Sequence, residues 1–299
     1  MEKVQILMST YNGASYLKTQ LDSILNQTYT NFSILVRDDG STDGTLAILR
    51  AYSEEYSNVS YYQGENIGVI QSFLELLRSS DDDAAYYGFA DQDDEWMPEK
   101  IERAIEKMQA CGGNQPLLYC SDTYLADSEL AVIGKDEKCA RPSLGNALVQ
   151  NICTGCTAVM NHRLRDIINR TSPKNIIMHD WWFYISAALF GGVCYDTEAY
   201  IKYRQHGNNQ FGAKTSKKEI WKHRIGQLFE KRGELYEQLR EIQRNYTDID
   251  EEQAGLIELV LRSQKGFGNR VRLVRNKEIY RNKPMDDRVY RGIVMIGKL

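Results

Sequence analysis

The feature that most constrains the fold is an alternation in the first half of the chain between short apolar runs and segments of helical periodicity. The apolar runs cover residues 4–9, 32–36, 59–62, 84–90 and 117–121, and the helical segments cover 16–25, 46–56, 69–77 and 98–108. Strands that alternate with helices are typical of βαβ units, whose strands pair in parallel. The sequence therefore predicts an α/β fold with a Rossmann-like, mostly parallel central sheet flanked by helices.

The second half of the chain is less regular, and its composition changes after Gly212. We expect strands at residues 153–160, 192–195 and 200–204, and helices at 163–169, 181–190, 217–246 and 251–262. The last two helices are rich in charged residues. These patterns predict an α/β domain over residues 1–212 and a helical, basic C-terminal appendage over residues 213–299.

The charge of the chain is small overall but unevenly distributed. A net charge of −4 at pH 7 argues against a nucleic-acid-binding protein. From Arg262 onward, however, eleven Lys or Arg residues stand against three acidic ones and alternate with aliphatic and aromatic side chains. Such a segment suits an anionic membrane surface or a neighbouring subunit of a homo-oligomer. We therefore expect the appendage to position the protein rather than to perform chemistry.

Membrane-spanning and secreted proteins are not indicated by the sequence. No stretch reaches the roughly 18 apolar residues that a spanning helix needs, and the apolar run near the N-terminus is only about seven residues long. We expect a cytoplasmic protein, dissolved or attached to the inner face of the membrane. The six cysteines include a single C-x-x-C pair, Cys153 and Cys156, which predicts reduced thiols rather than a zinc site.

Polar sequences follow three of the predicted strands at the point where each strand ends. They are Thr10-Tyr11-Asn12-Gly13, Arg37-Asp38-Asp39-Gly40-Ser41 and Asp91-Gln92-Asp93-Asp94. Open α/β sheets bind their ligands at the carboxyl ends of the strands, where the strand order reverses. These three sequences are therefore the first candidates for a binding site.

The two acidic sequences allow two interpretations each. Carboxylates such as those of residues 91–94 can hold Mg²⁺ or Mn²⁺ together with substrate phosphates, but a solvated acidic turn before a helix would explain them equally well. The pair Asp38-Asp39 can accept hydrogen bonds from ribose or a base N–H. A helix cap is the plainer alternative, for which Asp43 or Thr42 is better placed.

Together these sequences resemble glycosyltransferase family 2, which has the GT-A fold. The resemblance spans roughly residues 1–212 and rests on Met8-Ser9-Thr10-Tyr11-Asn12-Gly13, Gln27-Thr28-Tyr29, Arg37-Asp38-Asp39-Gly40-Ser41-Thr42-Asp43-Gly44, Glu65-Asn66-Ile67-Gly68 and Asp91-Gln92-Asp93-Asp94-Glu95-Trp96-Met97-Pro98-Glu99-Lys100. Within the family, the chain is most similar to bacterial rhamnosyltransferases of surface polysaccharides. The resemblance implies a metal-dependent glycosyltransferase that moves rhamnose from dTDP-rhamnose to a hydroxyl of a glycan acceptor.

The family's motifs imply roles for the donor-site residues that match them. The nucleotide base and ribose would contact Thr10, Tyr11, Asn12 and Asp39. The D-x-D carboxylates would be Asp91 and Asp93, with Asp93 the direct ligand of Mn²⁺ or Mg²⁺ and Asp91 a ligand or a ribose contact. Asp94 would lie next to them.

Further along the chain, the resemblance assigns the acceptor side of the site. Asp180, within Met178-His179-Asp180-Trp181-Trp182 before a predicted helix, matches the general base, although His179 stands where many relatives have Glu. Capping the helix is the alternative role for Asp180, but the reaction requires a base. Gly155, after Thr154, would let the backbone approach the donor sugar. Arg204 and His206 match a segment that contacts the pyrophosphate or the metal.

Members of the family that resemble this chain mostly invert the anomeric centre, which implies a single displacement. UDP-glucose, UDP-galactose or UDP-GlcNAc are the alternative donors, and the acceptor glycan would be lipid-linked or protein-linked. An inactive sugar-nucleotide-binding scaffold would be expected to lack the D-x-D or the base, and both are present. A nucleotidylyltransferase would need a Gly-rich basic loop after the first strand, which residues 10–13 do not provide.

Overall fold

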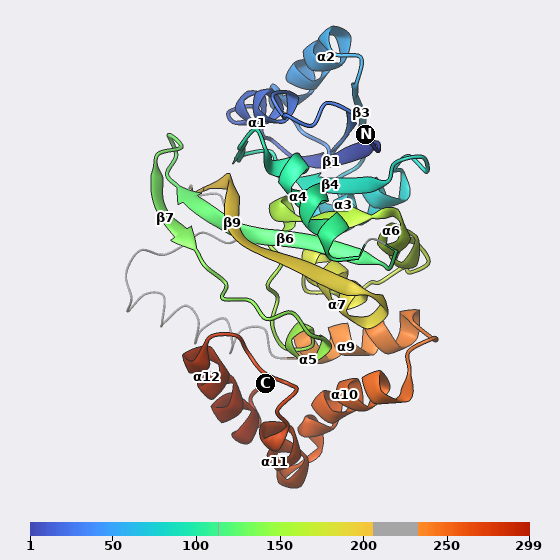
Figure 1. Ribbon diagram of the computed structural model, residues 1–299, viewed down its shortest axis with the longest axis vertical. Helices are drawn as coiled ribbons and strands as arrows, with labels where there is room; N and C mark the ends of the chain where they lie inside the picture. The colour runs from blue at the N-terminus through green and yellow to red at the C-terminus, as the bar shows by residue number, and fades with distance from the viewer. Residues whose placement is uncertain (113, 206–232) are drawn as a thin grey trace.

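The computed structural model describes residues 1–112, 114–205 and 233–299 (Figure 1). Its strands are β1 (Val4–Thr10), β2 (Phe32–Asp38), β3 (Val59–Gln63), β4 (Tyr86–Ala90), β5 (Glu95–Trp96), β6 (Leu117–Ala126), β7 (Val132–Asp136), β8 (Val159–Asn161) and β9 (Gly192–Arg204). Its helices are α1 (Leu17–Leu25), α2 (Thr45–Glu55), α3 (Gly68–Arg78), α4 (Lys100–Ala110), α5 (Leu144–Ala147), α6 (His162–Asn169), α7 (His179–Phe190), α9 (Glu234–Asn245), α10 (Glu251–Arg262), α11 (Phe267–Arg275) and α12 (Pro284–Met295), with 3₁₀ turns η1 (Gly155–Thr157) and η2 (Ser263–Lys265).

The strands form one sheet in the order β3-β2-β1-β4-β8-β6-β9-β5, and β7 pairs with β6 as a hairpin. The first four strands are parallel, as the alternating pattern predicts. Beyond β4 the sheet is mixed, because β8 runs antiparallel to both β4 and β6, and β5 runs antiparallel to β9. The sheet is therefore parallel in its N-terminal half and mixed beyond it, where β6 and β9 again pair in parallel.

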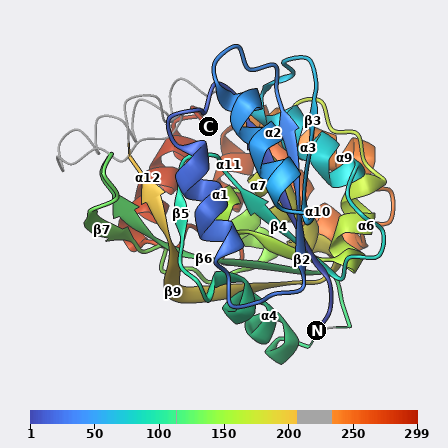
Figure 2. The same ribbon diagram turned by 90° about the horizontal axis from the view of Figure 1, so that it is seen from above.

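Helices cover both faces of the sheet (Figure 2). Along β1, Leu7 belongs to one apolar cluster while its neighbours Ile6 and Met8 belong to the other, because side chains alternate across a strand. The face of Ile6 and Met8 is packed by α1, α2 and α4. The face of Leu7 is packed by α3, α6 and α7. A fold with two covered faces buries β1 and β4 almost completely.

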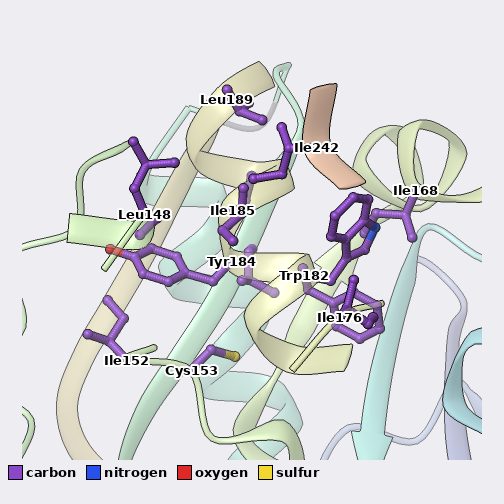
Figure 3. Close-up of a cluster of buried hydrophobic side chains, with 14 of the residues drawn as sticks. Leu148, Ile152, Cys153, Ile168, Ile176, Trp182, Tyr184, Ile185, Leu189 and Ile242 are labelled. Atoms are coloured by element: carbon purple, nitrogen blue, oxygen red, sulfur yellow. The ribbon is translucent and has the colours of Figure 1, made fainter. Parts of the chain in front are cut away.

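Helix α7 lies at the centre of the larger apolar cluster (Figure 3). Its side chains Trp182, Tyr184, Ile185 and Leu189 are buried, with Leu148 and Ile152 on one side and Ile168 and Ile176 on the other. Trp182 also stacks on Tyr246 of the segment that follows α9, with ring centroids 5.4 Å apart. The first turn of α7 is thus held rigidly by packing on several sides.

The C-terminal helices share this cluster with the α/β part of the chain. Leu239, Ile257, Leu273 and Tyr290 are all buried in it, and α10, α11 and α12 lie at the opposite end of the molecule from α2 (Figure 1). The predicted boundary at residue 213 lies outside the described residues and stays a prediction. Within the described residues, no helix combines the length and the apolar character needed to cross a membrane.

Several predicted elements differ from the observed ones. The strand expected at 153–160 is a 3₁₀ turn followed by the short β8, and the two strands expected at 192–195 and 200–204 are the single long β9. Helix α7 begins at His179 rather than after Asp180, so both residues lie in its first turn. The helix expected to begin at Pro98 begins at Lys100. Of the helix expected at 217–246, the described part is α9, which follows Gly233 with a φ of 89°.

Candidate active site

The sheet brings the three polar strand-end sequences to one edge. Strand β1 lies between β2 and β4, with Thr10 paired to Asp38 and Met8 paired to Ala90, the residue before Asp91. The loops that follow the three strands therefore leave the sheet side by side. This edge is where open α/β sheets bind their ligands.

The loop after β2 is organised by Asp38. Its carboxylate accepts hydrogen bonds from the Thr10 hydroxyl (3.0 Å), from the Ser41 backbone N–H (2.8 Å) and from the Ser41 hydroxyl (2.5 Å). Gly40 in the same turn has a φ of 84°, a conformation that favours glycine. Thr10 and Asp38 are buried, and the hydrogen bonds of Asp38 with Thr10 and Ser41 fix the path of this loop.

Asp39 is also buried, and both of its carboxylate oxygens have partners. Oδ1 is ion-paired with Arg37 and accepts from the Ile67 backbone N–H (2.9 Å), while Oδ2 accepts from the Gly68 N–H (2.9 Å). Asp39 therefore ties the loop after β2 to the start of α3. Arg37 belongs to one of the predicted strand-end sequences, but its ion pair with Asp39 was not predicted from the sequence.

The loop after β1 is tied to the acidic cluster by Gln92. Its side chain accepts from the Tyr11 N–H (2.8 Å) and donates to the Tyr11 carbonyl (3.1 Å). Asn12, with a φ of 48°, donates its N–H to Ser41 and accepts from the Thr42 N–H with its side chain. Tyr11 and Asn12 are exposed, so their side chains are accessible to a ligand. The role of Gln92 was not predicted, because its position between the two aspartates gives no sign of a partner.

The acidic cluster is electrostatically strained. Burial, followed by the charges of Asp93 and Asp180, raises the pKa of Asp91 to about 7. Burial and the same kind of repulsion raise the pKa of Asp94 well above its usual value. Asp94 Oδ1 accepts from the Arg204 N–H (3.1 Å), but its buried Oδ2 has no partner among the described residues. A cation at this cluster would relieve the repulsion.

A metal could be held by oxygen atoms of this cluster. Ligand atoms of Asp91, Asp94 and Cys156 lie within 4.8 Å of one another. Burial and the nearby carboxylates raise the pKa of the Cys156 thiol well above its usual value, so it stays protonated and is a poor ligand. The unpartnered Asp94 oxygen and the repelled Asp91 carboxyl fit a hard divalent cation, with Asp93 beside them in sequence.

Arg204 packs against the backbone of the acidic cluster. Its side chain is buried, donates from Nε to the Asp93 carbonyl (2.7 Å) and from Nη1 to the Ser128 carbonyl, and lies over the Tyr16 ring. In this arrangement Arg204 supports the backbone that carries Asp93. The contact with pyrophosphate stays a prediction. His206 lies outside the described residues.

Asp180 is buried in the first turn of α7, where the helix dipole favours a negative charge. It accepts from the Asn151 side-chain amide (2.9 Å), and the backbone N–H groups of Trp181 and Gly155 also favour its ionised form. Burial nevertheless raises the pKa of Asp180 to about 6. A carboxyl group with such a pKa can take up a proton near neutral pH. Asn151 was not predicted, and no local signal marks it.

Gly155 packs closely against the first turn of α7. An added Cβ would lie 3.0 Å from His179 Nε2 and 3.6 Å from Asp180 Oδ2. The glycine is therefore required by space rather than by its dihedral angles. The structure brings the predicted glycine and the predicted base together, and it links them to the acidic cluster, since the Asp180 charge acts on Asp91.

The segment of residues 278–282, which we call the C-terminal clamp, packs against the chain just before Asn151. Gly145 leaves no space for a side chain, because its Cβ would lie 2.0 Å from the Glu278 carbonyl oxygen. Asn146 donates to the Tyr280 carbonyl (3.0 Å), Arg281 donates to the Val149 carbonyl (3.1 Å), and the Asn282 N–H donates to Gln150 (2.8 Å). The clamp thus supports the loop that carries Asn151 to Asp180.

Comparisons with known proteins indicate the family and the fold of the chain. Residues 5–122 match the family model described as glycosyl transferase family 2. The chain is 31% identical over 232 residues to a protein of Shigella flexneri described as dTDP-rhamnosyl transferase RfbG, covering 73% of this chain and 78% of that one. It is 26% identical over 208 residues to an uncharacterized glycosyltransferase of Rickettsia typhi, and covers 64% of that relative's length.

Two solved structures show the same fold. One is S. aureus TarS 1-349 in complex with UDP-GlcNAc, with a TM-score of 0.61 and 16% identity over 99% of this chain and 89% of that one. The other is the mannosyltransferase PcManGT from Pyrobaculum calidifontis in complex with GDP-Man and Mn²⁺, with a TM-score of 0.55 and 15% identity over 90% of this chain and 71% of that one. At these identities the likeness concerns the fold alone.

Proposed function

The chain belongs to glycosyltransferase family 2 and has the GT-A fold, and on that basis we propose that it transfers rhamnose from dTDP-rhamnose to a hydroxyl of a glycan acceptor. The acceptor belongs to bacterial surface-polysaccharide or glycoprotein-glycan assembly. The preference for rhamnose is supported by the likeness to a relative described as a dTDP-rhamnosyl transferase. The alternative donors are UDP-hexoses, since a TarS structure of the same fold binds UDP-GlcNAc.

The observation that carries the proposal is the position of Asp180. Its carboxyl group has a pKa of about 6, packs against Gly155, and its charge contributes to raising the pKa of Asp91 in the acidic cluster. Transfer to a hydroxyl requires a base that can take up the hydroxyl proton, and Asp180 has a suitable pKa. It also requires a site for the departing diphosphate, and the neighbouring carboxylates are suited to the cation that would bind it. The three strand-end loops supply the adjacent surface for the nucleotide, with Tyr11 and Asn12 exposed.

In the proposed reaction, the acceptor oxygen attacks the anomeric carbon of the donor sugar. Asp180 takes the proton of that hydroxyl, the new carbon–oxygen bond forms, and the bond from the anomeric carbon to the diphosphate oxygen breaks. The electron pair of the broken bond leaves with dTDP. Because the acceptor attacks from the side opposite the leaving group in a single displacement, the anomeric configuration inverts and no covalent enzyme intermediate forms. Asn151 and the N-terminus of α7 hold the Asp180 carboxylate in position throughout.

The proposed enzyme binds Mn²⁺ or Mg²⁺ as a cofactor. Asp91 and Asp93 would hold it, with Asp94 behind them, and it would neutralise the diphosphate that departs. The arrangement is supported by the mutual repulsion of these carboxyl groups and by the unpartnered oxygen of Asp94. Two contacts keep the backbone of the acidic cluster in place: Arg204 donates to the Asp93 carbonyl, and Gln92 donates to the Tyr11 carbonyl.

A donor and acceptor screen tests the proposal. Release of nucleoside diphosphate is measured with dTDP-rhamnose, UDP-glucose, UDP-galactose and UDP-GlcNAc, each with Mn²⁺, first with water and then with octyl glycosides as acceptors. We expect turnover with dTDP-rhamnose to exceed that with the UDP-sugars, since each lost pocket contact costs about 1–3 kcal/mol. Preference for a UDP-sugar would refute the rhamnose assignment, and no turnover with any donor would refute transfer itself.

A further inference from the structure

The outer faces of α11 and α12 carry arginines without acidic partners. Arg272 and Arg275 on α11 and Arg288 on α12 are exposed, and within the described ranges of the chain none of the three forms an ion pair. By contrast, Arg291 on the inner side of α12 pairs with Asp287. The outer faces of the two helices therefore present positive charge to the solvent.

Large apolar side chains are exposed on the same two helices. Phe267 at the start of α11 is 64% exposed, and Met285 and Ile296, at the two ends of α12, are 53% and 58% exposed. Arg288 and Ile296 follow Met285 by three and eleven residues, so all three lie on one side of the helix. Exposed apolar groups and exposed cations thus alternate along one surface.

Packing turns these outer faces away from the rest of the protein. Leu273 of α11 and Tyr290 and Val294 of α12 are buried in the larger apolar cluster. Arg291 of α12 joins the two helices by donating to the Val274 carbonyl at the end of α11. Both helices lie at the end of the molecule opposite α2 (Figure 1). Their exposed side chains therefore form part of the outer surface of that end.

Charge is divided between this end and the rest of the chain. From Arg262 onward the sequence has eleven Lys or Arg residues and three acidic ones, whereas residues 1–261 have 26 Lys or Arg and 38 Asp or Glu. An anionic surface attracts the first group and repels the second, over a Debye length of about 8 Å at physiological ionic strength. Approach to such a surface therefore turns the end that carries α11 and α12 toward it.

We propose that the outer faces of α11 and α12, which we call the basic face, bind the anionic phospholipid surface of a membrane. Arg272, Arg275 and Arg288 contact the lipid phosphates, while Phe267 and Ile296 reach the boundary with the acyl chains. A second copy of this chain could offer carboxylates to the arginines, but it would place the apolar side chains against charged groups. A lipid surface accepts both kinds of side chain.

The basic face is connected to the acceptor side of the candidate site. The C-terminal clamp, residues 278–282, links α11 to α12 and contacts the loop that leads to Asn151. Binding at the basic face therefore holds the active site in a fixed position relative to the bilayer, which suits a lipid-linked acceptor. The inference goes beyond the proposed transfer reaction, because the residues of the basic face lie outside the candidate site.

Co-sedimentation of the full-length protein with vesicles tests the proposal. The vesicles contain phosphatidylglycerol and phosphatidylcholine in equal parts, or phosphatidylcholine alone. We expect binding to the anionic vesicles only, and it should weaken as the salt concentration rises. The triple variant Arg272→Gln, Arg275→Gln, Arg288→Gln should bind them about a hundredfold more weakly, since each cation near the surface contributes about fivefold.

A matched variant controls for the loss of charge. Arg50→Gln, Arg163→Gln, Arg170→Gln removes three exposed arginines outside the C-terminal helices and should leave vesicle binding within about twofold of wild type. A second variant, Phe267→Ser with Ile296→Ser, keeps the charge and should weaken binding about tenfold, because two apolar side chains no longer reach the lipid. All these positions are exposed, so the melting temperatures should stay close to that of the wild type.

The proposal would be overturned if the wild type bound neither kind of vesicle, or both kinds alike. Equal weakening in the two arginine variants would overturn it as well, since the attraction would then have no defined surface. A wild-type dimer in light scattering that dissociates in the Arg272, Arg275 and Arg288 variant, without vesicle binding, would assign the basic face to a second copy of the chain. Vesicle binding is measured without donor or acceptor, so its failure is distinct from failure of the proposed transfer.

Discussion

Asp180→Asn is the substitution that tests the proposed base most directly. It keeps the size of the side chain and an oxygen that can accept from Asn151, but it removes the basic carboxylate. General-base catalysis contributes about 10²–10⁴-fold, so kcat should fall at least a hundredfold while the affinity for dTDP changes little. The activity of the wild-type enzyme should likewise be lost at low pH, where Asp180 is protonated. With a pKa of about 6, only about one-tenth of Asp180 is ionised at pH 5, so kcat/KM should fall tenfold per pH unit below 6.

The same substitution should leave the protein more stable. Because the folded-state pKa of about 6 lies above the ordinary value of 3.8, the folded state holds the proton more tightly than the unfolded state. Stability contributed by the protonated group is therefore present below pH 3.8 and is lost as the pH rises through 6. At pH 7 the ionised carboxylate costs about 3 kcal/mol, which Asp180→Asn should relieve.

Urea unfolding at pH 7 and release of dTDP in a coupled assay measure the two effects. The expected outcome is an inactive variant whose unfolding midpoint rises. A variant that keeps more than a tenth of the wild-type kcat, or an activity profile without a fall near pH 6, would refute the assignment of the base. A variant that loses both stability and dTDP binding would show that Asp180 holds α7 in place instead.

The remaining predictions concern the metal, the loop after β1 and the C-terminal clamp. Asp93→Asn should weaken Mn²⁺-dependent binding of dTDP at least tenfold by calorimetry, while Asp83→Asn, at an exposed ion pair with Lys3, should not; unchanged binding in excess EDTA would contradict a metal site. Gln92→Ala should raise the KM for the donor severalfold with little change in melting temperature, because two hydrogen bonds to Tyr11 are lost; an unchanged KM would count against a donor contact through this loop. Gly145→Ala should lower the free energy of unfolding by about 1–3 kcal/mol, because its Cβ meets the Glu278 backbone. Gly255→Ala, in α10 with open space around it, should be neutral or stabilising, and equal effects of the two would refute the clamp.

The part of the fold that could be predicted from the sequence is the part built from local patterns. The alternation of apolar runs and helical segments indicated β1 to β4 and their helices, because each βαβ unit is encoded by neighbouring residues. The position of the three strand-end loops at one edge followed from parallel pairing. The pairing of β6 with β9 and the reversed direction of β8 did not, since partners distant in sequence leave no mark on local periodicity.

The same distinction applies to the candidate site. Asp91 and Asp93 stood out because acidic residues at a strand end are visible in a single sequence, whereas Asp180 was assigned through the resemblance of residues 178–182 to the family's acceptor-site motif. The residues that hold these carboxylates and their loops in place could not be predicted, because Gln92 and Asn151 act through contacts with residues far along the chain. The hydrogen bond from Arg204 to the Asp93 carbonyl could not be predicted either, and its contact with the pyrophosphate stays a prediction.

The C-terminal clamp has a consequence for the order in which the enzyme becomes active during synthesis. The acidic cluster, the glycine and the base are all made before residue 181, and the strands that carry them can pair as they leave the ribosome. The loop before Asn151, however, gains its partners Tyr280, Arg281 and Asn282 only about 130 residues later. A nascent chain that has released the whole α/β layer should therefore bind nucleotide before it can hold Asp180 in place for transfer. Partly synthesised chains would then bind the nucleotide-sugar donor without transferring its sugar.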